Sequence, residues 1–174
     1  MAATIIAETG ERSEALRLLH AVLATPVRGP NYDSWAGPAT RVAIAIGDVD
    51  LADALLAGLD GTSRAAVLGR RWSTAMIAEA RGEHERATPD YLAAAAEWKA
   101  LDAPFECASA YLGAARCLVA LGRPAEAGAP LADARSAFER LGAAPSLALV
   151  DALEQMMTAS SSASARGVPG EGIG

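Results

Sequence analysis

The chain has 174 residues, of which 52% are hydrophobic and only 5% aromatic, and about a quarter are alanine, the strongest helix former. Its net charge of −6, without any run of basic residues, argues against a nucleic-acid binder, because such proteins carry a basic face toward the phosphates. This composition predicts an all-α domain with no direct contact to nucleic acid.

The N-terminal sequence and the two cysteines indicate where in the cell the protein is expected. Residues 1–10 lack the basic start and the long apolar core of a signal peptide, and no apolar run reaches the roughly 20 residues that span a membrane. Cys107 and Cys117 fall on one predicted helix in poor register for a disulfide, so we expect buried thiols. We therefore expect a cytoplasmic protein that does not contact a membrane.

Proline, glycine and capping residues divide the chain into predicted helices. Residues 1–9 are too short for a full packed helix, and Asp48 and then Thr62 or Ser63 are predicted to cap the helices that follow them. The predicted helices cover residues 11–24, 33–46, 49–59, 63–81, 83–101, 104–121, 124–141 and 145–158.

Two prolines and the C-terminal composition modify this outline. Pro89 implies either that its helix begins at Thr88 as a cap or that the helix is kinked at Pro89, and Pro130 predicts a mild kink. From Thr158 onward the residues are mostly serine, alanine and glycine, which cannot build a packed core. We expect residues 1–157 to form the domain and residues 158–174 a flexible tail.

The sequence contains an internal repeat that begins at glycines spaced 37, 35 and 40 residues apart. In stacked helical hairpins the glycine turns the hairpin, a small residue lets its two helices touch, and a large residue fills the gap to the next hairpin. The glycines are Gly10, Gly47, Gly82 and Gly122; five residues later stand Ala15, Ala52, Ala87 and Ala127; nine later stand Leu19, Leu56, Tyr91 and Leu131; twelve later stand Val22, Leu59, Ala94 and Ala134.

These positions resemble the tetratricopeptide repeat (TPR) over residues 10–155. Residues 43–58, 78–82 and 111–141 are similar to the C-terminal repeats of actinobacterial LuxR-type ATP-dependent transcriptional regulators and cyclase–ATPase–repeat signalling proteins. The resemblance implies a TPR-like solenoid of about four hairpins, with a truncated N-terminal helix and a C-terminal capping helix. It also implies a region that senses a ligand or partner and controls other domains.

The chain departs from those relatives in several motifs. It has no GxxxxGK[ST] phosphate loop, no helix-turn-helix after Leu153 and no cyclase segment, so ATP binding and DNA binding do not carry over. The aromatic residue expected eleven positions before each glycine is kept only as Tyr111, whereas Ala36 and Arg71 occupy the other two places. The sequence is that of the repeat module without these effectors.

The candidate site is the concave groove, which the first helix of each hairpin lines in such solenoids. Two arginines, a tryptophan and a glutamate on this surface predict that the groove binds an acidic peptide. The alternative is that Trp72 and Met76 only pack between hairpins and that the arginines are solvated. The candidate binding residues are Arg41, Trp72, Met76, Glu79, Leu112 and Arg116.

The sequence does not contain a complete residue pattern for a metal site or a catalytic motif. Asp48, Asp50 and Asp53 do not make a calcium loop, because Leu59 stands where the bidentate glutamate belongs. His84 and His20 each stand alone, so no metal or cofactor is predicted. Ser73, Thr74 and Ser109 have no base near them in sequence and no GxSxG occurs.

We therefore expect a non-catalytic, protein- or peptide-binding regulatory module, the repeat part of a bacterial signalling or transcription regulator. The alternatives are a small-molecule sensor with its ligand in the concave face and, from another class, a small helical enzyme. The incomplete first hairpin also predicts a homodimer through the truncated N-terminal edge, because repeat proteins cover their terminal apolar surfaces.

Overall fold

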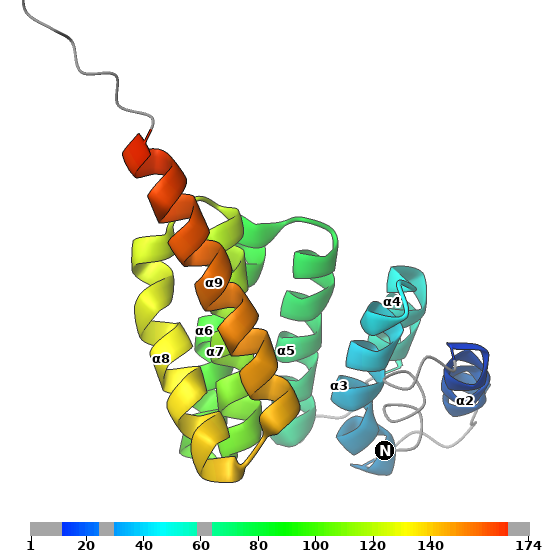
Figure 1. Cartoon of the computed structure of the whole chain (residues 1–174). Coiled ribbons are helices and arrows are strands. Elements are labelled where there is room, and N and C mark those ends of the chain that lie inside the picture. Colours follow the sequence, from blue (N-terminus) through cyan, green and yellow to red (C-terminus); the bar gives the residue numbers. More distant parts are fainter. Residues whose placement is uncertain (1–11, 25–29, 59–63, 167–174) are drawn as a thin grey trace, which may run out of the picture.

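The computed structural model describes residues 12–24, 30–58 and 64–166, and every regular element in these ranges is an α-helix (Figure 1). The prediction of an all-α chain is confirmed for this part. Residues 1–11, and with them Gly10, lie outside the described ranges, as do Leu59, Thr62 and Ser63. The helices are α2 (Arg12–Ala24), α3 (Pro30–Ala45), α4 (Val49–Ala57), α5 (Arg64–Ala80), α6 (His84–Ala100), α7 (Pro104–Ala120), α8 (Pro124–Leu141) and α9 (Ala144–Arg166).

The three described glycines of the repeat make the same turn. Gly47, Gly82 and Gly122 have φ values of 79°, 79° and 72°, the left-handed conformation that glycine adopts without steric cost. After each glycine, the next amide donates a hydrogen bond of 2.9 Å to a carbonyl five residues earlier, which is the Schellman arrangement. The sequence repeat therefore corresponds to a repeated structural turn, between α3 and α4, α5 and α6, and α7 and α8.

The small and large residues of the repeat are buried where the pattern requires it. The alanines five residues after each glycine, from Ala15 to Ala127, are all 0% exposed. Of the large residues, Leu19, Tyr91 and Leu131 are 3% exposed or less, and Leu56 is partly buried. Because alanine has almost no side chain, the helices of each pair come close together, and the large residue fills the space beside them.

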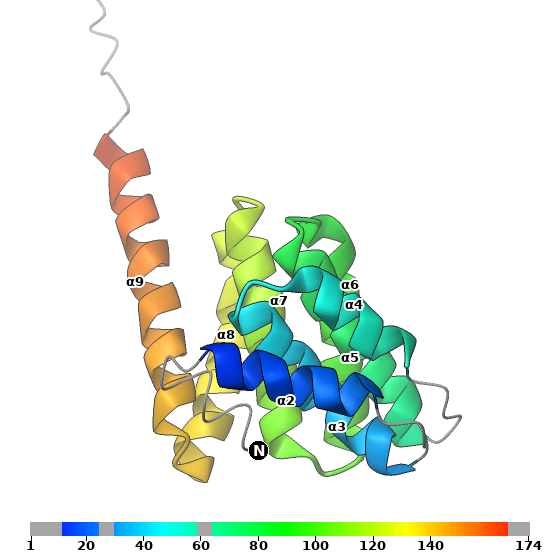
Figure 2. The same ribbon diagram turned by 90° about the vertical axis from the view of Figure 1, so that its right-hand side faces the viewer.

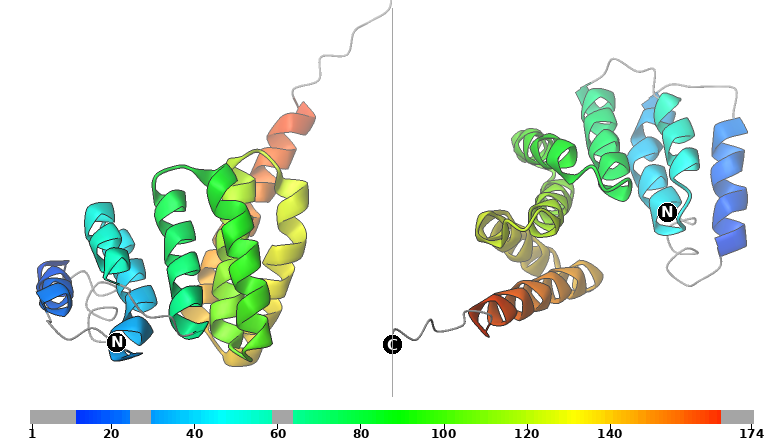
Figure 3. Two further views of the ribbon diagram at one scale, coloured as in Figure 1. Left: turned by 180° about the vertical axis from the view of Figure 1, so that it is seen from behind. Right: turned by 90° about the horizontal axis from the view of Figure 1, so that it is seen from above.

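In the part of the chain that the structure describes, the core forms three clusters that share helices. One cluster joins α2, α3, α4 and α5, a second joins α5, α6 and α7, and a third joins α7, α8 and α9. Helix α3 also packs directly against α5, and α7 contacts both α5 and α9. Figure 2 views the molecule from the α2 side, with α2 in front of the other helices, and the view from above in Figure 3 shows the helices following a curved path from α2 to α9.

Helix boundaries agree with the sequence prediction within a few residues, except at the end of α9, and Asp48 caps α4 by accepting a 2.9 Å hydrogen bond from the amide of Leu51. Helix α6 starts at His84 with Pro89 inside it. Of the two alternatives for Pro89, a helix that begins at Thr88 is therefore wrong, and the Thr88 hydroxyl donates within the helix to the carbonyl of His84, 2.8 Å away.

Helix α9 continues to Arg166, through residues that the sequence predicted as the start of a flexible tail. Serine and alanine extend an existing helix at little cost, because propagation lacks the penalty of nucleation. Residues 167–174 lie outside the described ranges. Among the described helices none is both long and apolar enough to cross a membrane. Both cysteines are free thiols, with Cys117 buried.

Candidate functional site

The first helices of three consecutive pairs, α3, α5 and α7, bring an arginine and two aromatic rings together. The guanidinium carbon of Arg41 lies 5.3 Å from the ring centre of Trp72 and 5.7 Å from that of Phe105. Both distances fall within the range of cation–π attraction. Arg41 is partly exposed, so a charge held by rings from two other helices reaches the surface.

The Trp72 ring that supports Arg41 is itself held by packing. It is 4% exposed and meets the ring of Trp98 on α6 edge to face, with ring centres 6.1 Å apart and planes at 75°. Aromatic pairs prefer this geometry because the positive edge of one ring meets the negative face of the other. The guanidinium group of Arg41 therefore packs against a ring that its neighbours hold in place.

An ion pair between α5 and α7 forms the second part of the site. Arg116 donates from Nε and Nη2 to the two carboxylate oxygens of Glu79, at 2.6 and 2.8 Å. The Glu79 side chain is 17% exposed and that of Arg116 is 42% exposed. This two-pronged arrangement fixes both side chains and neutralises most of the charge of Arg116, while part of its guanidinium still faces solvent.

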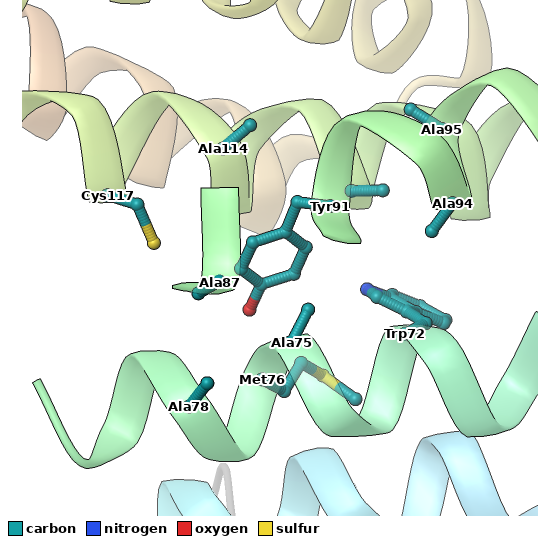
Figure 4. Close-up of a cluster of buried hydrophobic side chains, with 11 residues drawn as sticks. Trp72, Ala75, Met76, Ala78, Ala87, Tyr91, Ala94, Ala95, Ala114 and Cys117 are labelled. Carbon is teal, nitrogen blue, oxygen red and sulfur yellow. The ribbon is translucent and has the colours of Figure 1, made fainter. Parts of the chain in front are cut away.

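Tyr91 of α6 completes this network from inside the core. Its hydroxyl donates to Oε2 of Glu79 at 2.5 Å, although the residue is only 1% exposed. Figure 4 shows its ring pointing from α6 toward α5, among Ala75, Ala87 and Ala114. The network thus ties three helices to one carboxylate.

Gly113 of α7 makes room for the Tyr91 ring. A Cβ atom at Gly113 would lie 2.5 Å from Cζ of Tyr91, much closer than any real carbon–carbon contact. Glycine is required here for close approach, although its place inside a helix is unfavourable in itself.

Burial keeps the Tyr91 hydroxyl and the Cys117 thiol protonated. Burial, followed by the negative charge of Glu79, raises the pKa of the Tyr91 hydroxyl, so Tyr91 remains a hydrogen-bond donor at neutral pH. The same two causes, burial first, raise the pKa of the Cys117 thiol to about 12. Cys117 is therefore an inert, apolar residue beside the network.

The structure places the six predicted site residues on α3, α5 and α7, and four of them form two contacting pairs. Glu79 and Arg116 contact each other, and Arg41 contacts Trp72. The three apolar members are core residues: Trp72, Met76 and Leu112 are 4%, 7% and 3% exposed. For Trp72 and Met76 this matches the alternative that the sequence left open, in which they pack between hairpins.

Sequence spacing missed Phe105, Tyr91 and Gly113. Phe105 stands near the start of α7, outside the three spacings that defined the predicted groove, and its contact with Arg41 spans 64 positions (105 − 41). The pairing of Gly113 with Tyr91 had one signal, a glycine inside a predicted helix, which often marks close approach. We define the α3–α5–α7 face as Arg41, Trp72, Glu79, Phe105 and Arg116.

Two of the hydroxyl residues considered for chemistry in the sequence lie on α5. The Thr74 hydroxyl donates to the carbonyl of Arg70 at 2.9 Å, one turn earlier in α5, and Ser73 is 0% exposed. No group of three or more histidine, cysteine, aspartate or glutamate side chains suited to a metal ion occurs among the described residues.

Comparison with known proteins returns no match: no family model, no curated protein and no solved structure is similar to this chain.

Proposed function

We propose that this chain is a TPR-like helical-repeat module that binds a protein or peptide without catalysis, as part of a bacterial signalling or transcription regulator. The TPR-like architecture is supported by the equivalent turns at Gly47, Gly82 and Gly122 and by the buried alanine five residues after each. The regulatory role rests on the sequence resemblance to actinobacterial regulators.

The observation that carries the binding proposal is the position of Arg41. A guanidinium above an aromatic face still donates hydrogen bonds from its edge, which suits a carboxylate, and a preorganised arginine loses little freedom when it binds. Arg116 lies on the same face, where it pairs with Glu79 and its side chain is 42% exposed. In this proposal the partner is a peptide segment whose acidic side chain adds to the contacts of Arg41 and whose neighbouring residues lie along α5 and α7.

A peptide array followed by fluorescence anisotropy tests this proposal. The array varies acidic, basic and apolar residues in fluorescein-labelled octapeptides, and we expect the strongest binders to be acidic. Arg41→Glu should weaken the best binder at least tenfold. Arg64→Glu, which makes the same charge change at the exposed start of α5, is the matched control and should weaken it less than twofold.

Two results would overturn the proposal: equal losses in the two variants, or an array without acidic preference. Arg116→Glu is unsuitable as the test, because it would place a second carboxylate against Glu79 and destabilise the fold.

We further propose that the edge formed by α2 pairs with a second copy of the chain. Ala15 and Leu19 of α2 are buried, but Leu16, Leu18 and Val22 remain partly exposed. Sedimentation of the protein should show a dimer, and Leu18→Glu should convert it to a monomer. A monomer in the unsubstituted protein at high concentration excludes this arrangement.

A further inference from the structure

A second, different site lies where α6, α7 and α8 meet. A pocket of about 270 Å³ opens there, with α7 as its floor and with the end of α6 and the last turns of α8 as its walls. Lys99 comes from the end of α6 and Asp102 from the turn that follows it, whereas Asp133 and Arg140 come from α8. The pocket is lined by Lys99, Asp102, Ala103, Pro104, Cys107, Ala108, Tyr111, Asp133, Ser136, Ala137 and Arg140.

The charged groups around this pocket do not pair with one another. Lys99, Asp102 and Asp133 form no ion pair within the described residues, and Arg140 donates only to the Ser136 hydroxyl, at 2.7 Å. Two other arginines at the start of α8 and within it behave differently, since Arg123 pairs with Glu126 and Arg135 pairs with Glu154. Two cationic and two anionic side chains thus surround one pocket, and their charged groups can interact with a bound molecule.

The spacing along α8 explains why these groups stay apart. Asp133 and Arg140 are seven residues apart, which is about 10 Å along the helix axis. A single turn would bring opposite charges into contact, whereas two turns separate them by the length of a small molecule. Tyr111, on the pocket floor, adds a hydroxyl group to the lining.

We propose that this pocket binds a small zwitterion with a carboxylate at one end and an ammonium group at the other, such as an ω-amino acid or a dipeptide. The carboxylate is held by Lys99 and Arg140 from opposite walls, and the ammonium group is held by Asp133. The site is separate from the α3–α5–α7 face and does not depend on the peptide-binding role proposed for that face.

Cys107 on the pocket floor supplies a built-in reporter. Its side chain lines the pocket and is half-buried, whereas Cys117 is fully buried. Burial raises the pKa of the Cys107 thiol, and the nearby charge of Lys99 acts in the opposite direction. An alkylating reagent that enters the pocket will therefore react at Cys107 and spare Cys117.

The first experiment compares two reagents at Cys107 by peptide mass spectrometry of the full chain: iodoacetate, which carries a carboxylate, and iodoacetamide, which is neutral. In each reaction the thiolate attacks the CH₂ carbon, a carbon–sulfur bond forms, iodide leaves and the thiol proton passes to solvent. We expect the rate ratio of iodoacetate to iodoacetamide to exceed that of N-acetylcysteine amide at least fivefold. Lys99→Ala with Arg140→Ala should return the ratio to the reference value.

The matched control is Arg12→Ala with Arg64→Ala, which removes the same charge from the exposed starts of α2 and α5 and should leave the ratio unchanged. A wild-type ratio equal to the reference, or an equal fall in both double variants, would overturn the proposal.

The second experiment tests the zwitterion. Glycylglycine and 4-aminobutyrate should slow the alkylation of Cys107 by iodoacetamide at concentrations where butyrate and butylamine do not, and Asp133→Asn should abolish this protection. Equal protection by butyrate would contradict the assignment of Asp133 to an ammonium group, and no protection by either zwitterion would overturn the site as a whole.

Discussion

Gly113 and Tyr91 show how one missing side chain positions a buried hydroxyl. Because the Tyr91 ring fills the space where a Cβ would stand, Gly113→Ala should force the ring or helix α7 to move, at a cost of about 1–3 kcal/mol in unfolding free energy. Gly128 in α8 has nothing within 4 Å of the same position, so Gly128→Ala should stabilise the chain by about 0.5–1 kcal/mol.

Urea denaturation of both glycine variants measures the difference. Effects of the same sign would show that Tyr91 does not depend on close approach to Gly113.

The buried acids predict a dependence of stability on pH. The folded state holds the Cys117 proton up to a pKa of about 12, whereas the unfolded thiol loses it near 9. Since the folded state binds more protons between these values, the free energy of unfolding should fall as the pH rises, by up to about 1.4 kcal/mol per pH unit for this group. Tyr91, whose pKa is raised in the same direction, adds to the loss above its ordinary value near 10.

Urea denaturation at pH 8, 9 and 10 of the wild type and of Cys117→Ala tests this dependence. The variant should be less stable at pH 8, because it loses buried volume, but its stability should fall less steeply with pH. Parallel curves for the two proteins would exclude Cys117 as a source of the dependence.

At the scale of the helices, the three glycine turns should be energetically equivalent. Alanine in a left-handed conformation costs about 1–2 kcal/mol, and no neighbouring atom lies within 4 Å of the Cβ position at Gly47, Gly82 or Gly122. Each single alanine variant should therefore lower the unfolding free energy by a similar amount.

Denaturation of the three glycine variants under identical conditions is the measurement. A variant with no loss of stability would show that its turn differs from the others, and this would weaken the repeat interpretation.

Helix positions were predictable because glycine and proline act locally. Gly82 and Gly122 end a helix whatever surrounds them, and Pro104 and Pro124 occupy the first helical position that suits proline. The start of α6 was less predictable, since Pro89 removes one amide donor but does not prevent a turn of helix before it. The extension of α9 to Arg166 was missed because the serine- and alanine-rich composition shows only that these residues cannot build a packed core. A helix that has already formed can still extend into them, since serine and alanine have sufficient helix propensity.

Sequence spacing predicted only part of the candidate site. It placed Glu79 and Arg116 on one surface, and the structure joins them by two hydrogen bonds. Sequence spacing predicts which face of its own helix a residue occupies. It does not predict how far a neighbouring helix buries the side chain on that face. Trp72, for that reason, is a buried support for Arg41 instead of an exposed anchor.

At the scale of the whole molecule, consecutive helix pairs share their core with their neighbours. Arg135 of α8 contacts Asp151 and Glu154 of α9, and Val150 and Leu153 join the last cluster. The exposed side of α9 combines small and polar residues, such as Ala148, Ala152 and Gln155, with Leu149 and Met156, which are 58% and 54% exposed. The role of α9 as a capping helix stays a prediction.

The central claim is that a partner segment binds on the α3–α5–α7 face, and two-dimensional ¹H–¹⁵N NMR tests it most directly. Addition of the tightest acidic peptide from the array should shift the indole N–H signal of Trp72 and the amide signals around Arg41, Phe105 and Arg116. Signals of α8 and of the pocket formed by α6, α7 and α8 should stay in place. Shifts confined to α8 and α9, with the Trp72 indole signal unmoved, would contradict the account and place the partner elsewhere on the molecule.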